Sequence, residues 1–239
     1  MKKFAFSLTL LYLSTLFALS GEEIIKDSDG KDCYIYTPET IKADKTYWLV
    51  VGVHALNGNG KRACGVSSWA KRLDCIVIGP TFDKGYQAGN GEHARKVVQL
   101  HKELSTQYKL HDKIFVHGYS AGAQFAHRFT FQEPTLVGGL SAHSAGSWAT
   151  GGPWAEINRR AKDIPFALSC GEKDTVKSFP QAPMTRLEWF QLFREELKKK
   201  RFSNLTTQVI PNAKHRQVKA CLEMAEACFK EAQKTFPVK

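Results

Sequence analysis

The chain has 239 residues, a formal net charge of +11 and a hydrophobic content of 43%. No linker, low-complexity tract or internal repeat divides residues 21–239, which excludes a second domain and leaves a single α/β domain of ordinary size. The basic charge favours acidic partners, but no nucleic-acid-binding motif accompanies it, so we expect no nucleic acid partner.

The N-terminus has the pattern of a secretory signal peptide. Lys2 and Lys3 precede an apolar run over residues 4–19, and Ser20 ends a small-x-small cleavage motif. The apolar run is short for a bilayer span. We therefore expect residues 1–20 to be removed, and we expect a secreted or periplasmic protein with no stable membrane anchor.

The rest of the chain alternates between strand and helix patterns. Strands are predicted over residues 33–37, 47–53, 75–78, 113–116, 136–142, 165–170 and 205–210, and helices over residues 63–73, 92–108, 123–129, 188–200 and 218–234. This alternation predicts a mostly parallel central sheet with helices on both faces and an active site at the carboxyl ends of the strands. Residues 134–163 contain no long apolar helix, so we expect no large lid domain.

Six cysteines in a chain predicted to be exported indicate disulfides. No C-x-x-C or His-rich spacing points to a metal site, and we expect none. Cys221 and Cys228 lie too far apart on one predicted helix to bridge each other. We expect Cys170, at the end of a predicted strand, to pair with Cys221, at the start of that helix.

The sequence G-Y-S-A-G at residues 118–122 lies between a predicted strand and a predicted helix. Strand, sharp turn and helix form the context of a nucleophile elbow, with the serine at the turn. Gly118 and Gly122 are small enough for the tight backbone that this turn needs. Ser120, at the head of a helix whose dipole favours negative charge, is the predicted nucleophile.

A serine nucleophile needs a histidine base and a carboxylate behind that base, and in this type of fold the order along the chain is nucleophile, acid, histidine. Asp174 follows the predicted strand 165–170, and His215 follows the strand 205–210. We predict Asp174 as the acid, with Glu172 as its rival, and His215 as the base. His143 also follows Ser120, but it comes directly after the predicted strand 136–142, the neighbour of the elbow strand, so no later strand precedes it to hold an acid.

The oxyanion of an acyl-transfer reaction needs two backbone N–H donors. Ala121, directly after the nucleophile, is predicted to supply one. Leu56, in the Gly-rich loop over residues 54–60, is predicted to supply the other, with Ala55 as the alternative. Trp148 and His143 are candidates for the substrate-binding wall, with core packing as the alternative for each.

In their order along the chain, these motifs resemble the α/β-hydrolase superfamily over nearly all of residues 21–239. H-A-L-N-G-N-G, G-Y-S-A-G, G-E-K-D and a late A-K-H are similar to secreted esterases grouped with poly(3-hydroxybutyrate) depolymerases and feruloyl or acetylxylan esterases. The resemblance implies ester hydrolysis through an acyl-enzyme intermediate by Ser120, Asp174 and His215, without a cofactor. The chain departs from those enzymes in carrying His54-Ala55 where they carry His-Gly.

The expected substrate is an acylated polysaccharide, a polyester or an aryl ester, and an acidic or acylated polymer is a candidate partner. Two alternatives stay open. One is a serine peptidase of the prolyl-oligopeptidase type, against which the absence of an N-terminal propeller weighs. The other is a non-catalytic binding protein, against which the complete Ser120, Asp174 and His215 set weighs.

Overall fold

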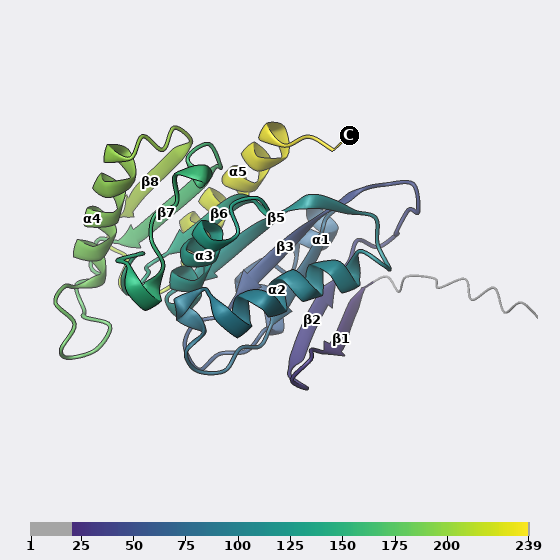
Figure 1. Ribbon diagram of the computed structural model, residues 1–239, viewed down its shortest axis with the longest axis horizontal. Coiled ribbons are helices and arrows are strands. Elements are labelled where there is room, and N and C mark those ends of the chain that lie inside the picture. The colour runs from purple at the N-terminus through teal and green to yellow at the C-terminus, as the bar shows by residue number, and fades with distance from the viewer. Residues whose placement is uncertain (1–20, 239) are drawn as a thin grey trace, which may run out of the picture.

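An eight-stranded sheet runs through the computed structural model, which describes residues 21–238 (Figure 1). The predicted signal peptide lies outside the described residues. The strand order is β1-β2-β4-β3-β5-β6-β7-β8. The strands are β1 (Glu22–Lys26), β2 (Asp32–Tyr36), β3 (Tyr47–Val53), β4 (Ile76–Pro80), β5 (Leu110–Tyr119), β6 (Val137–His143), β7 (Phe166–Gly171) and β8 (Leu205–Ile210).

The sheet is mostly parallel, as predicted. Only β2 runs against its two neighbours, β1 and β4, and the pairs from β4 through β3 to β8 are all parallel. Every residue of β3 is buried, as expected for a strand that is covered on both faces. The edge strand β1 was not predicted, because its exposed positions alternate along a short segment with little apolar content.

Helices cover both faces of the sheet (Figure 1). They are α1 (Trp69–Arg72), α2 (Gly91–Leu104), α3 (Ala121–Gln132), α4 (Arg186–Lys199) and α5 (Lys219–Thr235). Leu49 and Val51 of β3 face the core formed with α2, α3 and α4, whereas Val50 between them faces the core formed with α1 and α5. Alternation along the strands therefore builds two cores, one on each face.

The prediction of a helix over residues 63–73 is wrong for the first half of that range. Residues Lys61–Gly65 form a tight turn in which Arg62, Ala63 and Cys64 have positive φ angles of 66°, 43° and 55°. This turn packs directly on β3, where a Cβ on Gly52 would lie 2.1 Å from the carbonyl oxygen of Ala63. The backbone of the turn approaches the backbone of β3 so closely that only glycine fits at position 52, and this contact favours the turn over a helix.

The predicted disulfide between Cys170 and Cys221 does not form, because all six cysteines are free thiols. Cys170 lies on β7 with its sulfur 3.8 Å from the Ser144 hydroxyl, in the core under α2, α3 and α4. Cys221 packs with Ile210 in a separate cluster. Cys170 and Cys221 therefore sit in different clusters, and no bridge forms between them.

The connection between β6 and β7 holds only two single-turn helices, Gly152–Trp154 and Arg159–Ala161, so the described residues include no large lid domain. Within residues 21–238, none of the helices has both the length and the apolar character that a membrane span requires.

Candidate active site

Ser120 occupies the sharp turn between β5 and α3. Its φ of 57° and ψ of −117° form a strained conformation for a residue with a side chain. The backbone N–H of Ser120 donates to the carbonyl oxygen of His143 (2.9 Å), which anchors the turn on β6. A Cβ on Gly122 would lie 2.1 Å from the carbonyl oxygen of Val53, so the start of α3 rests directly on the end of β3.

The three side chains predicted to act together are joined by hydrogen bonds. His215 Nε2 lies 3.0 Å from Ser120 Oγ, and His215 Nδ1 lies 2.8 Å from Asp174 Oδ2. An ionised carboxylate only accepts hydrogen bonds, so Nδ1 carries the proton and the lone pair of Nε2 faces the serine hydroxyl. The rival acid Glu172 is exposed and accepts the backbone N–H of Asn212 instead (2.8 Å).

Arg186, which the sequence did not single out, is the second group facing the buried acid. Its Nη1 lies 3.8 Å from Asp174 Oδ1 and donates to the carbonyl oxygen of Val176 (3.0 Å). Asp174 is fully buried, and Oδ1 has no hydrogen-bond partner among the described residues. The nearby guanidinium offsets part of the cost of burying this carboxylate.

The ring of Tyr119 supports the His215 imidazole. The two rings stack with centroids 5.1 Å apart and planes inclined by 30°. Burial raises the pKa of Tyr119 to about 12, so its phenol stays neutral beside the histidine at all moderate pH values. This packing limits rotation of the imidazole that bridges Ser120 and Asp174.

His143 lies behind the elbow rather than on the wall of the site. Its Nδ1 is 2.8 Å from the Ser169 hydroxyl, its Nε2 is 3.1 Å from the carbonyl oxygen of Arg216, and its side chain does not line the cavity beside Ser120. Burial lowers the pKa of His143 to about 4 and keeps the ring neutral. His143 was a candidate for the substrate-binding wall or for core packing, and the structure shows core packing.

A cavity of about 490 Å³ opens beside Ser120. Its lining is mixed: Leu56, Gln87, Ser120, Ala121, Gln124, Gly146, Ser147, Thr150, Trp154, Ser178, Phe179, Ala182, Pro183, Arg186 and Trp189. Leu56 and Ala121 therefore border the same space as the serine. Within residues 21–238, neither backbone N–H of this pair donates a hydrogen bond to the protein, so both are available to a bound oxyanion.

The loop that carries Leu56 is fixed by His54. The Tyr86 hydroxyl donates to the carbonyl oxygen of His54 (2.7 Å), and the Phe82 N–H donates to His54 Nε2 (2.9 Å). Nδ1 must then be the protonated nitrogen, which donates to the carbonyl oxygen of Ala55 (2.7 Å). Burial lowers the pKa of His54 and favours this neutral form.

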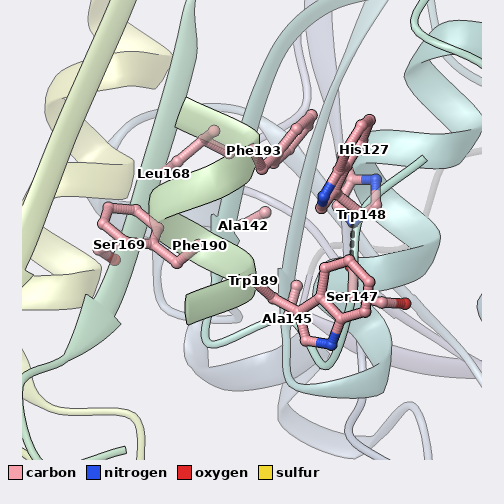
Figure 2. Close-up of a pocket in the computed structure, with 10 residues that line it drawn as sticks. All are labelled: His127, Ala142, Ala145, Ser147, Trp148, Leu168, Ser169, Trp189, Phe190 and Phe193. Atoms are coloured by element: carbon pink, nitrogen blue, oxygen red, sulfur yellow. Dashed lines mark hydrogen bonds between the residues drawn. The ribbon is translucent and has the colours of Figure 1, made fainter. Parts of the chain in front are cut away.

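Trp148, predicted to contact substrate, borders a different space. It stacks on Phe193 of α4, with centroids 5.8 Å apart, and lines a separate, small cavity of about 10 Å³, enough for a single water molecule (Figure 2). Trp154 and Trp189 line the cavity beside Ser120 instead. Trp148 thus lies one layer behind the wall that it was predicted to form.

No protein-family model matches the sequence, and no curated protein matches it. Solved structures do match. A thermostable esterase is 16% identical with a TM-score of 0.66, over 89% of this chain and 62% of that one, so the chain spans less than two thirds of its length. A poly(3-hydroxybutyrate) depolymerase from Bordetella parapertussis is 19% identical with a TM-score of 0.65, over 91% of this chain and 90% of that one.

A ferulic acid esterase from Anaeromyces mucronatus, solved with ferulic acid, is 14% identical with a TM-score of 0.65, over 91% of this chain and 90% of that one. At these identities the similarity concerns the fold. The predicted fold class is confirmed: the chain has the α/β-hydrolase fold.

Proposed function

We propose that the protein is a serine hydrolase that cleaves carboxylic esters through an acyl-enzyme intermediate on Ser120. The observation that carries this proposal is the hydrogen-bonded series from Ser120 through His215 to Asp174, with the serine on a strained turn at the edge of an open cavity. A serine hydroxyl is a weak nucleophile, and this arrangement supplies the base that activates it.

In the first half of the reaction, the Ser120 hydroxyl gives its proton to His215 Nε2 while Oγ attacks the ester carbonyl carbon. The carbonyl oxygen becomes an oxyanion, to which the N–H groups of Leu56 and Ala121 donate. Asp174 stabilises the imidazolium through Nδ1–H. His215 then returns the proton from Nε2 to the departing alkoxide, which leaves as the alcohol.

In the second half, water enters the position of the alcohol. It gives a proton to His215 Nε2 and attacks the acyl carbon, and the same N–H groups hold the second oxyanion. The Ser120–acyl bond then breaks, Oγ takes the proton from Nε2, and the carboxylic acid departs. Every proton transfer in both halves passes through His215 Nε2.

The proposal includes export, for which residues 1–20 provide the sequence argument, and an acylated polysaccharide, a polyester or an aryl ester as substrate. Apolar side chains at the cavity mouth support a substrate with an apolar portion: Leu56 is 51% exposed, Trp154 44% and Phe179 56%. Exposed side chains of this kind around a cavity are typical of a binding surface.

A panel of 4-nitrophenyl acyl esters and aminoacyl 4-nitroanilides tests the proposed reaction. We expect release of nitrophenol from the esters by the wild-type protein, no release by Ser120→Ala, and little or no nitroaniline from the anilides. Faster turnover of the anilides would identify a peptidase. Wild-type protein that cleaves neither class, while its melting temperature shows a folded state, would point to the non-catalytic binding protein.

A further inference from the structure

Three side chains of α3, the helix that begins directly after Ser120, hold one serine of the cavity wall. Gln124 Nε2 and Arg128 Nη2 both donate to Ser147 Oγ, at 2.9 Å and 2.7 Å. His127 Nε2 lies 3.1 Å from the carbonyl oxygen of Ser147 and donates to it (Figure 2). Positions 124, 127 and 128 share one face of the helix, so Ser147 is fixed relative to the nucleophile.

The Ser147 hydroxyl can only donate a hydrogen bond to any further partner. A hydroxyl oxygen has two lone pairs and one hydrogen, and here both lone pairs accept hydrogen bonds, one from Gln124 and one from Arg128. Within the described part of the chain, no acceptor takes the hydroxyl hydrogen. Because Ser147 and Gln124 line the cavity beside Ser120, that hydrogen is available to a ligand there.

Arg128 places a positive charge directly behind this serine. Its side chain is buried, with an exposed fraction of 1%, and it stacks on the Trp154 ring at 4.8 Å. Its other hydrogen bonds go to the neutral carbonyl oxygens of Gln87 (2.6 Å) and Trp148 (3.2 Å). Burial lowers the pKa of Arg128 to about 9, so the group is still charged at neutral pH.

No Asp or Glu forms an ion pair with Arg128 among the described residues, and none lines the cavity. A buried charge without a counterion is unfavourable, and hydrogen bonds to neutral carbonyl groups offset only part of that cost. Arg186 also lines the cavity, but its guanidinium is already paired with the buried Asp174 (3.8 Å). A negative group that entered the cavity beside Ser147 would therefore meet a hydrogen-bond donor with the unpaired charge of Arg128 behind it, on a wall that carries no carboxylate.

We propose that this wall of the cavity binds a carboxylate group of the substrate. The Ser147 hydroxyl donates to the carboxylate, and Arg128 supplies the positive charge behind it. The inference rests on the proposed function and narrows it: the preferred substrates are esters that carry a carboxylate on the acyl or the alcohol part. Ser147 is then a specificity-determining residue rather than a participant in bond cleavage.

Two matched pairs of esters test the preference. The mono-4-nitrophenyl ester of glutaric acid is compared with its terminal amide, and 4-acetoxybenzoate with 4-acetoxybenzamide, so that the two members of each pair have nearly the same shape but only one carries a negative charge. A hydrogen bond to a charged group predicts a kcat/KM about tenfold higher for the acid in at least one pair. Equal values within both pairs, or a preference for the amides, would overturn the proposal.

Ser147→Ala should bring the ratio of acid to amide close to one, because it removes the donated hydrogen. The matched control is Ser178→Ala, which removes a hydroxyl from the same cavity. Ser178 donates to the carbonyl oxygen of Gly146 (3.4 Å) and has no hydrogen bond with Arg128, so its ratio should equal that of the wild type. A ratio that survives in Ser147→Ala would contradict the role of this serine.

Calorimetric titration of Ser120→Ala with the same four compounds separates this inference from the proposed function. We expect the acid of one pair to bind about tenfold more tightly than its amide, and the difference to disappear in the double variant with Ser147→Ala. If the wild type hydrolysed none of the compounds, the proposed function would fail, and this titration would still decide the carboxylate site. Equal affinities in Ser120→Ala would reject the site even where hydrolysis is observed, and this comparison does not require Ser147→Ala to fold.

Discussion

Two histidines lie against the ring of Tyr119, and they sit in very different surroundings. His215 stacks on the ring at 5.1 Å and His143 at 5.7 Å. Each also contacts a serine hydroxyl, Ser120 for His215 (3.0 Å) and Ser169 for His143 (2.8 Å). Contact between a histidine and a serine hydroxyl therefore does not by itself distinguish the two histidines.

The partner of the other ring nitrogen separates them. His215 has the carboxylate of Asp174, which stabilises a positive imidazolium, whereas His143 Nε2 has two neutral partners, the carbonyl oxygen of Arg216 and the Ser144 hydroxyl (3.3 Å). The His215 side chain is partly exposed, at 28%, whereas His143 is buried. A serine and a histidine in contact become a candidate catalytic pair only where a buried carboxylate supports them and a substrate can reach them.

Replacing the two serines is the strongest test of this difference. Ser120→Ala should lower kcat for a 4-nitrophenyl ester by a factor on the order of 10⁶, because removing the nucleophile disables the whole triad. Ser169→Ala, the matched change beside His143, should leave kcat within about tenfold of the wild type. If Ser120→Ala kept more than a few per cent of the wild-type activity, or if Ser169→Ala lost as much kcat, the two serine–histidine pairs would not differ in function as argued.

Replacing the carboxylate should have the next largest effect. Asp174→Asn keeps the shape of the side chain but loses the negative charge, and kcat should fall by up to about 10⁴. Glu172→Gln is the matched control, because Glu172 lies two residues away and accepts a hydrogen bond from Asn212 rather than from His215. Steady-state kinetics on one ester measures kcat for both variants. A larger loss of kcat in Glu172→Gln than in Asp174→Asn would make Glu172 the acid.

The proposed oxyanion donor can be removed through the backbone. Leu56→Pro deletes the N–H that borders the cavity, and the loss of one donor of this kind typically costs about 10² to 10³ in kcat. Leu56→Ala keeps the N–H and removes only the exposed side chain, so its kcat should stay close to that of the wild type. Equal losses in both variants would mean that the side chain, and not the N–H, is what matters.

His143 should affect stability rather than turnover. Its pKa is lowered by burial to about 4 from a value of 6.5, so the unfolded chain binds the proton more readily. The stability gained from the neutral ring is complete above pH 6.5 and is lost as the pH falls toward 4. Between pH 7 and pH 5 this lowers the free energy of unfolding by about 2 kcal/mol.

His143→Gln should make that part of the pH dependence disappear while esterase turnover persists. Urea denaturation of both proteins at pH 7 and pH 5 measures the difference. A variant with the same acid destabilisation as the wild type would show that His143 is not the group responsible.

Sequence reasoning succeeded where local patterns decide the structure. The continuous apolar run over residues 47–53 became β3 without a shift, and residues 205–210 became β8. Strand order along the chain then placed Ser120, Asp174 and His215 at one edge of the sheet, because parallel strands end on the same side. The alternation of strand and helix, rather than any single motif, located these three residues.

The features that the sequence did not predict share a physical cause, because each depends on contact between segments far apart in the chain. The turn at Ala63 depends on its approach to Gly52. Arg186 returns to Asp174 through a loop with no motif, and Ser147 has its position because α3 holds it. The expected disulfide failed for the same reason, since Cys170 and Cys221 pack in separate clusters. None of these contacts has a signal in the local sequence.

Trapping the acyl-enzyme tests the central claim most directly. The wild-type protein is mixed with 4-nitrophenyl acetate, quenched with acid within the first turnover, digested and analysed by mass spectrometry. The account predicts one added acetyl group on the peptide that contains Ser120, and none on that peptide in His215→Ala under the same conditions. An acetyl group on another residue, or equal labelling of Ser120 in His215→Ala, would contradict it.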